Sequence, residues 1–135
     1  MPSLRTRRLF ISHAWRYDDD YRTIVNWLDG ASNFEWENYS VPSHDGCEET
    51  STAGLKRCLT RQINPTQCII IIAGMYAAYS EWIDYEIDEA VRLNKIIIGV
   101  RPRGNERIPL KITNNARQIV NWNSASLISA IREYI

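Results

Sequence analysis

The sequence predicts an α/β protein with a flavodoxin-like, three-layer fold, in which helices cover both faces of a central parallel sheet of about five strands. Segments typical of strands and of helices alternate along the whole chain, which favours right-handed crossovers between parallel strands. The run from Gln67 to Ala73 (QCIIIIA) is apolar without alternation, as expected of a central strand covered on both faces. Because no repeat, low-complexity tract or linker interrupts this pattern, we expect a single domain over residues 1–135.

The first half of the chain predicts the order strand, helix, strand, helix, strand. Apolar residues recur at helical spacing from Tyr21 to Leu28, after three consecutive aspartates that favour a helix N-terminus. A polar stretch, PSHDGCEETST, ends in residues that cap helices and precedes the second helix. We therefore expect strands at 8–13, 35–41 and 67–73, with helices at about 18–28 and 55–62.

The second half continues the alternation with one exception. Ser80 is suited to cap a third helix that runs to about Asn94, and the buried strand KIIIGV follows at 95–100. A weaker strand at 118–122 and a helix at 124–134 close the chain. The segment from Arg101 to Arg117 is predicted to be a long polar connection, where a fourth helix would normally sit.

Composition narrows the classes of protein to which the chain belongs. With 44% hydrophobic residues and 16 Lys and Arg against 16 Asp and Glu, the chain is predicted to be globular, with no groove for nucleic acid. The N-terminus lacks the apolar core of a secretion signal, and the longest apolar run is about half of what a membrane helix needs. We therefore expect a cytoplasmic protein with no membrane partner. The three cysteines show no CxxC spacing, which predicts free thiols.

The loops that follow the strands are where open α/β sheets bind ligands. After the first strand comes Ser12-His13-Ala14-Trp15, a hydroxyl, an imidazole and an indole that suit a ring and a ribose better than a bare phosphate. Phosphate-binding glycine motifs are absent, and so is the acidic pair of a phospho-receiver. No metal site is expected, because His13 and His44 lack metal-ligand spacing with any cysteine.

One carboxylate of the third helix projects toward the core. With Ile83 at zero and about 100° per residue, Ile87 lies near +40°, Ala90 near −20° and Glu86 near −60°. An ionised glutamate there is costly unless it is paired or faces a water-filled cleft. Two interpretations stay open at this point: a structural salt bridge with an arginine, or a functional carboxylate. Trp82, one turn earlier, is either a packing residue or part of the same site.

Several short motifs resemble those of the TIR-like proteins of the bacterial Thoeris anti-phage system. They are Phe10-Ile11-Ser12-His13, TSTAGLKR from Thr50, SEWIDYEI from Ser80 and NKIIIGV from Asn94, over about residues 7–100. In TIR domains a Ser-x-Trp-x-x-x-Glu pattern supplies the catalytic glutamate, and Ser80, Trp82 and Glu86 match it. The chain departs from animal and plant TIR domains at Ile83, where a cysteine is common, and lacks their Phe-Trp motif near the last helix.

The resemblance implies a TIR-like fold and an enzyme that uses NAD+ as substrate, without a further cofactor. Glu86 would be catalytic, and the product would be ADP-ribose, a cyclic ADP-ribose isomer or a related conjugate in antiviral defence. It also implies self-association and a separate effector protein that senses the product. We expect the following residues to contact substrate: Ser12, His13, Trp15, Asp45, Tyr76 and Trp82.

One glutamate is enough for such a reaction. An O-glycosidase needs a second carboxyl group to protonate its leaving oxygen, whereas nicotinamide leaves as a neutral molecule. Two alternatives remain: a TIR-like interaction module without turnover, and a nucleoside-processing transferase of similar fold.

Overall fold

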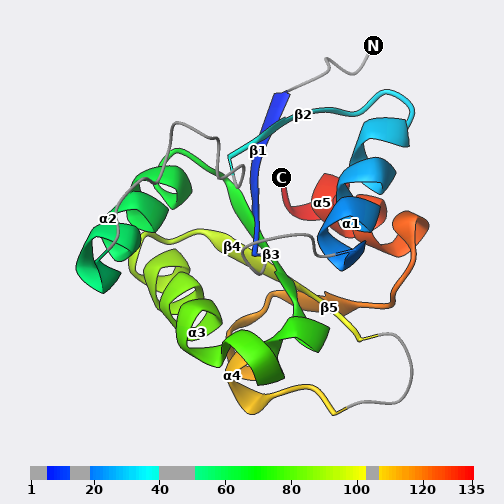
Figure 1. Ribbon diagram of the computed structural model, residues 1–135. Coiled ribbons are helices and arrows are strands. Elements are labelled where there is room, and N and C mark those ends of the chain that lie inside the picture. Colours follow the sequence, from blue (N-terminus) through cyan, green and yellow to red (C-terminus); the bar gives the residue numbers. More distant parts are fainter. Residues whose placement is uncertain (1–5, 13–18, 40–50, 103–106) are drawn as a thin grey trace.

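Within the part of the chain that the structure describes, five parallel strands form one sheet in the order β2-β1-β3-β4-β5 (Figure 1). The computed structural model describes residues 6–12, 19–39, 51–102 and 107–135, and the side chains of residues 75–79 are not described. Neighbouring strands are held in register by pairs such as Leu9 with Cys68 and Ile71 with Gly99. The strands are β1 (Thr6–Ile11), β2 (Glu35–Asn38), β3 (Cys68–Ile72), β4 (Ile96–Val100) and β5 (Gln118–Val120).

At the start of α2 (Thr52–Ile63) and of α5 (Ser124–Tyr134), a side chain satisfies a free backbone N–H group. The Ser51 side chain accepts a hydrogen bond from the Gly54 N–H at the start of α2, and Asn123 does the same for Ser126 at the start of α5. The helices are α1 (Asp19–Gly30), α2 (Thr52–Ile63), α3 (Tyr76–Arg92), α4 (Leu110–Asn115) and α5 (Ser124–Tyr134), with the 3₁₀ turn η1 (Ala73–Met75) before α3.

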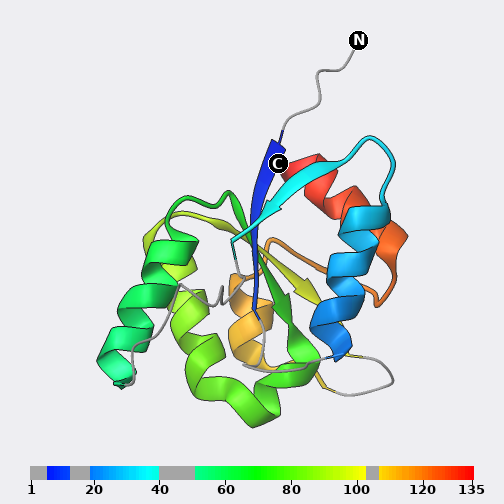
Figure 2. The ribbon, with the colours of Figure 1, turned by 45° about the horizontal axis from the view of Figure 1, so that its top comes forward.

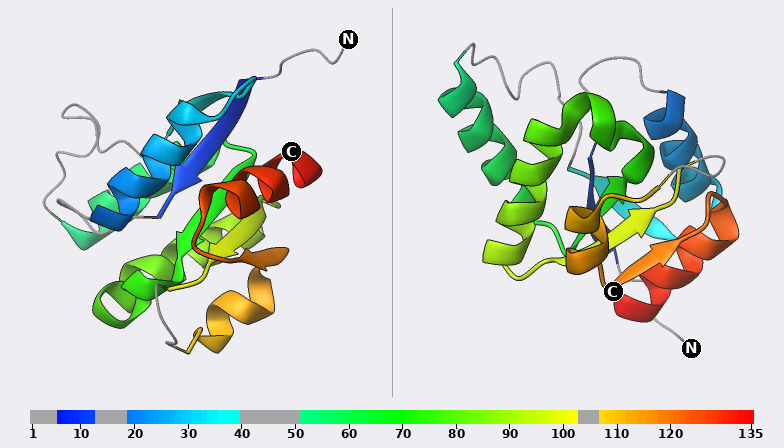
Figure 3. Two further views of the ribbon diagram at one scale, coloured as in Figure 1. Left: turned by 90° about the vertical axis from the view of Figure 1, so that its right-hand side faces the viewer. Right: turned by 90° about the horizontal axis from the view of Figure 1, so that it is seen from below.

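The sheet separates two hydrophobic cores. Along β3, Cys68, Ile70 and Ile72 belong to the core beneath α1 and α5, whereas Ile69 and Ile71 belong to the core beneath α2, α3 and α4. Figures 2 and 3 show these two groups of helices on opposite sides of the strands. All five residues of β3 are buried, as the unbroken apolar run predicts for a central strand. The predicted flavodoxin-like α/β architecture is confirmed.

Three expectations about local structure are wrong. The third helix starts at Tyr76 and not at Ser80, because η1 leads into it directly from β3. The connection 101–117 contains α4, whose six residues bury one apolar side chain, Ile112, and are too few for a periodic pattern. Cys58 is in a disulfide bond, whereas Cys68 is free and buried.

Across the described ranges, every helix is too short or too polar to cross a bilayer.

Candidate active site

Ser12 lies at the end of β1, beside the end of β3, where the strand order changes direction. Its side chain is buried, and its Oγ accepts a hydrogen bond from the Ile72 N–H at 3.1 Å. Its own N–H donates to the Ile70 carbonyl oxygen at 2.8 Å. Ligands of open α/β sheets bind outside this switch point, so Ser12 joins the two strands that form the floor of the expected site.

Glu86 lies on α3 and is 3% exposed. Its neighbours on the same helix face, Ile83, Ile87 and Ala90, pack in the core between α3 and the sheet. Among the described residues, Glu86 Oε1 has no hydrogen-bond partner, and no arginine pairs with this carboxyl group. Burial raises the pKa of Glu86 well above its usual range. The arginine salt bridge, one of the two interpretations left open by the sequence, is therefore not formed within the described part of the chain.

The contacts of α3 show where Glu86 lies around the helix. Tyr85 and Glu89 contact α2, through the Lys56 carbonyl oxygen and the Thr60 hydroxyl. Asp88 contacts α4 on the other flank, through Lys111. Glu86 projects between the residues that face α2 and those that face the sheet, so the projection directs its carboxyl group toward the angle between α2, α3 and the strands.

Glu89 is a second buried carboxyl group that the helical projection misses. The projection places it outside the apolar arc, but α2 covers it, and it is 8% exposed. Arg92 donates two hydrogen bonds to its oxygens, at 2.7 and 2.8 Å, and Thr60 donates one at 2.6 Å. The hydrogen bonds from Arg92, followed by those from Thr60 and Tyr85, lower the pKa of Glu89 to about 2 against the effect of burial. The Glu89–Arg92 spacing of three residues is a helix-pair signal that could have indicated this partner.

Of the other residues expected to contact substrate, the structure describes the side chain of one, Trp82. Trp82 is half-buried and packs against the core that contains Ile83 and Ile87, one turn before Glu86. Tyr76 is the first residue of α3, and its side chain is not described. Three residues lie outside the described ranges: His13, Trp15 and Asp45. The structure thus brings Trp82 and Glu86 to adjacent turns of one helix and leaves the remaining contacts as predictions.

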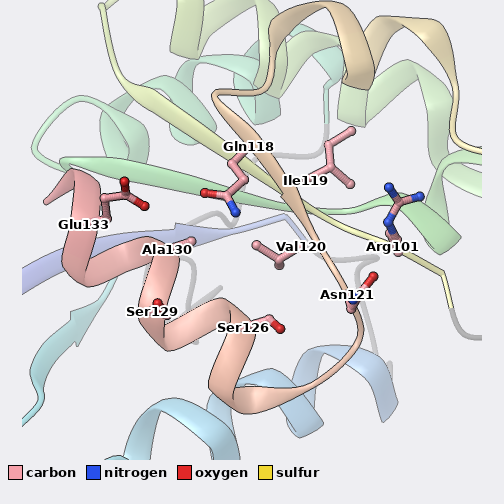
Figure 4. A pocket seen from close by; sticks show the side chains of 9 residues that line it. All are labelled: Arg101, Gln118, Ile119, Val120, Asn121, Ser126, Ser129, Ala130 and Glu133. Atoms are coloured by element: carbon pink, nitrogen blue, oxygen red, sulfur yellow. The ribbon is translucent and has the colours of Figure 1, made fainter.

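Two hollows lie away from Glu86. One, of about 400 Å³, lies between β5 and α5 on the opposite face of the sheet (Figure 4). The other, of about 510 Å³, lies near the start of β4 and includes Lys95 and Arg117. Neither is lined by Ser12, Trp82 or Glu86. Within the described ranges, no three His, Cys, Asp or Glu side chains lie close enough together to hold a metal ion.

Residues 10–107 match the family model of the Thoeris protein ThsB, TIR-like domain. The chain belongs to this family. The matched segment contains Ser12, Ser80, Trp82 and Glu86, so the Ser-x-Trp-x-x-x-Glu pattern lies inside the ThsB TIR-like domain. No curated protein sequence shows significant similarity to the chain.

Two solved structures resemble this ThsB-type domain. The CMP N-glycosidase BcmB of Clostridium botulinum has a TM-score of 0.60 and 14% identity, over 96% of this chain and 100% of that one. A protein of Burkholderia pseudomallei described as pilus assembly-related has a TM-score of 0.59 and 12% identity, over 96% of this chain and 88% of that one. At these identities the likeness shows the fold alone.

Proposed function

We propose that this ThsB-type TIR-like protein cleaves the bond between nicotinamide and ribose in NAD+, with Glu86 as the catalytic carboxylate. The observation that carries the proposal is the buried Glu86 carboxyl group, whose Oε1 has no hydrogen-bond partner among the described residues. A buried polar atom left without a partner costs stability. Such a cost is typical of a functional site, where a ligand supplies the missing interaction.

The chemistry needs one negative charge close to ribose C1. The C1–N bond breaks with both electrons going to the pyridinium nitrogen, so nicotinamide leaves neutral and the ribose carries an oxocarbenium-like positive charge. A carboxylate held in a water-poor site stabilises that charge more strongly than one in water. Water attacks C1 and loses a proton to give ADP-ribose, whereas attack by a nitrogen or hydroxyl of the same molecule gives a cyclic isomer.

The positive charge of the substrate opposes the effect of burial on the pKa of Glu86. Before binding, desolvation favours the protonated carboxyl group. A pyridinium ring nearby favours the ionised form, so binding of NAD+ and loss of the Glu86 proton would be coupled. The half-buried Trp82 one turn earlier is suited to stack on the pyridinium ring by cation–π attraction, which weakens when nicotinamide becomes neutral.

A second candidate is a nucleotide N-glycosidase acting on a nucleoside monophosphate. The structural likeness to a CMP N-glycosidase favours it, because both proteins share the fold over nearly their whole length. Both reactions break a bond between ribose C1 and a base nitrogen. They differ in the leaving group: the nicotinamide ring of NAD+ carries a positive charge before the bond breaks, whereas the cytosine ring of CMP is neutral.

The test compares three proteins on two substrates. Wild type, Glu86→Gln and the matched control Glu81→Gln, an exposed glutamate of the same helix, are incubated with NAD+ or with CMP, and released base is measured by chromatography. We expect nicotinamide from wild type and from Glu81→Gln, and a loss of about 100-fold or more in Glu86→Gln. Cytosine without nicotinamide would establish the second candidate. Equal turnover by Glu86→Gln would remove Glu86 from the mechanism.

A second experiment, in cells, tests the proposal if the protein becomes active only after infection. Protein-free filtrates are prepared after phage challenge from cells that express wild type or Glu86→Gln, and NAD+ and ADP-ribose derivatives are measured. We propose that the wild-type filtrate contains an ADP-ribose derivative that activates a separate effector. A fall in NAD+ with an inert filtrate would indicate a simple NAD+ hydrolase. Unchanged NAD+ in both strains would favour an interaction module.

A further inference from the structure

Four side chains form one polar network at the contact between α2 and α3, and we name them the α2–α3 clasp: Thr60, Tyr85, Glu89 and Arg92. The Glu89 carboxylate is their common acceptor: Arg92 and Thr60 donate to it at 2.6–2.8 Å, and Tyr85 donates at 3.3 Å. The Tyr85 hydroxyl has one proton, which it shares between Glu89 Oε1 and the Lys56 carbonyl oxygen of α2, 3.0 Å away, and its oxygen lies close to that of Thr60. The two Arg92–Glu89 bonds lie within α3, and the links that cross to α2 are those of Thr60 with Glu89 and Tyr85 and of Tyr85 with the Lys56 carbonyl oxygen. Hydrogen bonds to an ionised group are about twice as strong as neutral ones, so the Thr60–Glu89 bond is a strong link between the two helices.

Glu86 lies one turn before Glu89 and takes no part in this network. Because its Oε1 has no hydrogen-bond partner among the described residues, the position and hydration of its carboxyl group depend on how closely α2, α3 and the sheet pack around it. The sheet side is closed by apolar side chains such as Ile69 and Ile71. On the α2 side, Leu59 and Ile63 add apolar contact, and the clasp supplies the directional bonds.

We propose that Glu89 is a positioning residue, which acts through the α2–α3 clasp to hold α2 closed over Glu86 and so keep water from its carboxyl group. The catalytic part of this proposal rests on the proposed function, because excluding water from Glu86 favours catalysis if its carboxylate stabilises a ribosyl cation. The structural part does not depend on the proposed function: moving α2 away from α3 should let water reach Glu86 whether or not NAD+ is the substrate.

The other charged side chains on the elements around Glu86 are exposed, partly exposed or paired. On α2, Arg57 and Arg61 are exposed, and on α3, Glu81 and Asp88 are exposed and Asp84 is partly exposed. On α2, the Lys56 ammonium lies 5.4 Å from the centre of the Tyr85 ring. On α3 itself, Glu89 is neutralised by Arg92. On α4, Lys111 pairs with Asp88. The strands beneath contribute isoleucines. The raised pKa of Glu86 is caused by desolvation, so its value reports how much water reaches the carboxyl group.

The opposite flank of α3 offers a matched control. Asp88 binds Lys111 of α4 at 2.6 Å, and the Asp88 side chain is 62% exposed. Asp88→Asn therefore removes a carboxylate and an interhelix link from the same helix, one residue from Glu89, but on the side away from α2. Thr60→Val and Thr60→Ser form a second pair, in which the first removes the clasp hydroxyl without changing any charge and the second keeps it.

The test measures the pKa of Glu86 in the substrate-free protein by NMR of ¹³C-labelled glutamate side chains, with Glu86→Gln assigning the signal. We expect Thr60→Val and Glu89→Gln to lower the pKa of Glu86 by about one unit or more, toward that of a hydrated carboxyl group. Thr60→Ser and Asp88→Asn should leave it unchanged. In the cleavage assay, the low-pH limb of kcat/KM should move with the pKa in the same variants.

The outcomes separate the clasp from the proposed function. If Thr60→Val lowers the melting temperature but leaves the pKa of Glu86 unchanged, the clasp is merely structural and the inference is overturned. The same holds if Asp88→Asn lowers this pKa as much as Glu89→Gln does. If Thr60→Val shifts the pKa but no variant releases nicotinamide, the clasp stands and the proposed NAD+ chemistry fails. Should Glu89→Gln not fold, the Thr60 pair alone decides.

Discussion

Glu86 and Glu89 lie three residues apart on α3 and are both almost fully buried. Their pKa values are nevertheless shifted in opposite directions. Burial alone acts on Glu86 and raises its pKa, whereas charge-assisted hydrogen bonds, led by those from Arg92, lower the pKa of Glu89 to about 2. The difference follows from their positions on the helix. Glu89 reaches the polar surface of α2, but Glu86 faces the apolar angle between α2 and the sheet.

Glu86→Gln should stabilise the protein at neutral pH. Because the folded-state pKa of Glu86 is above its unfolded value, the favourable contribution of the protonated group is complete below about pH 4.5 and is lost as pH rises through the folded pKa. Removing the ionisable group avoids that loss at neutral pH. Urea unfolding at about pH 7.5 and at about pH 4.5 should show a gain that shrinks at the lower pH. A destabilised Glu86→Gln at neutral pH would indicate a structural role for the carboxylate.

Cleavage of NAD+ should become faster as pH rises through the pKa of Glu86. The reaction needs the ionised carboxylate, and desolvation places its titration above the usual glutamate range. Initial rates of nicotinamide release, measured from about pH 5 to about pH 9, should show an acid limb with an apparent pKa above 4.5. Saturating NAD+ should move this limb to lower pH, because the pyridinium favours the ionised carboxylate. A rate that is constant down to about pH 5 would contradict the proposed coupling.

Glu89 should make the protein sensitive to acid. Its pKa is depressed from 4.5 to about 2, so its stabilisation is present above pH 4.5 and is lost as pH falls toward 2. The loss is on the order of 2 kcal/mol once screening at the exposed Arg92 is allowed for. Unfolding free energies at several pH values should fall less steeply below pH 4.5 in Glu89→Gln than in wild type. Asp88→Asn serves as the control and should retain the wild-type slope.

The sequence predicts the sheet well because its strongest signals are local. The unbroken isoleucines of β3 and β4 can be satisfied only by strands buried on both faces, and both strands are central. The burial of Glu86 also follows from helical projection, because one angle decides which side chains face the sheet. The position of α4 does not follow, since a six-residue helix held by Ile112 and the Lys111–Asp88 pair carries too short a pattern.

Glu89 shows why the site is harder to predict than the fold. Projection onto one helix accounts for burial by the sheet, but α2 covers Glu89 from the side. The register between two helices that contact each other is a tertiary property, and neither Thr60 nor Tyr85 carries a local signal for it. The contributions of His13, Trp15 and Asp45 lie outside the described ranges and stay predictions.

Ser12 gives a last test, of the link between β1 and β3. Its Oγ is the acceptor for the Ile72 N–H, and both residues are fully buried. Ser12→Ala leaves that N–H without an acceptor in the core, which costs about 1–3 kcal/mol. The midpoint of denaturant unfolding should fall with an unchanged slope, and Ser12→Thr should restore part of the loss because it keeps the hydroxyl. The control is Ser129→Ala on the exposed side of α5, expected within about 0.5 kcal/mol of wild type. If Ser12→Ala is as stable as wild type but raises the KM for NAD+, the hydroxyl serves the substrate and not the strand pair.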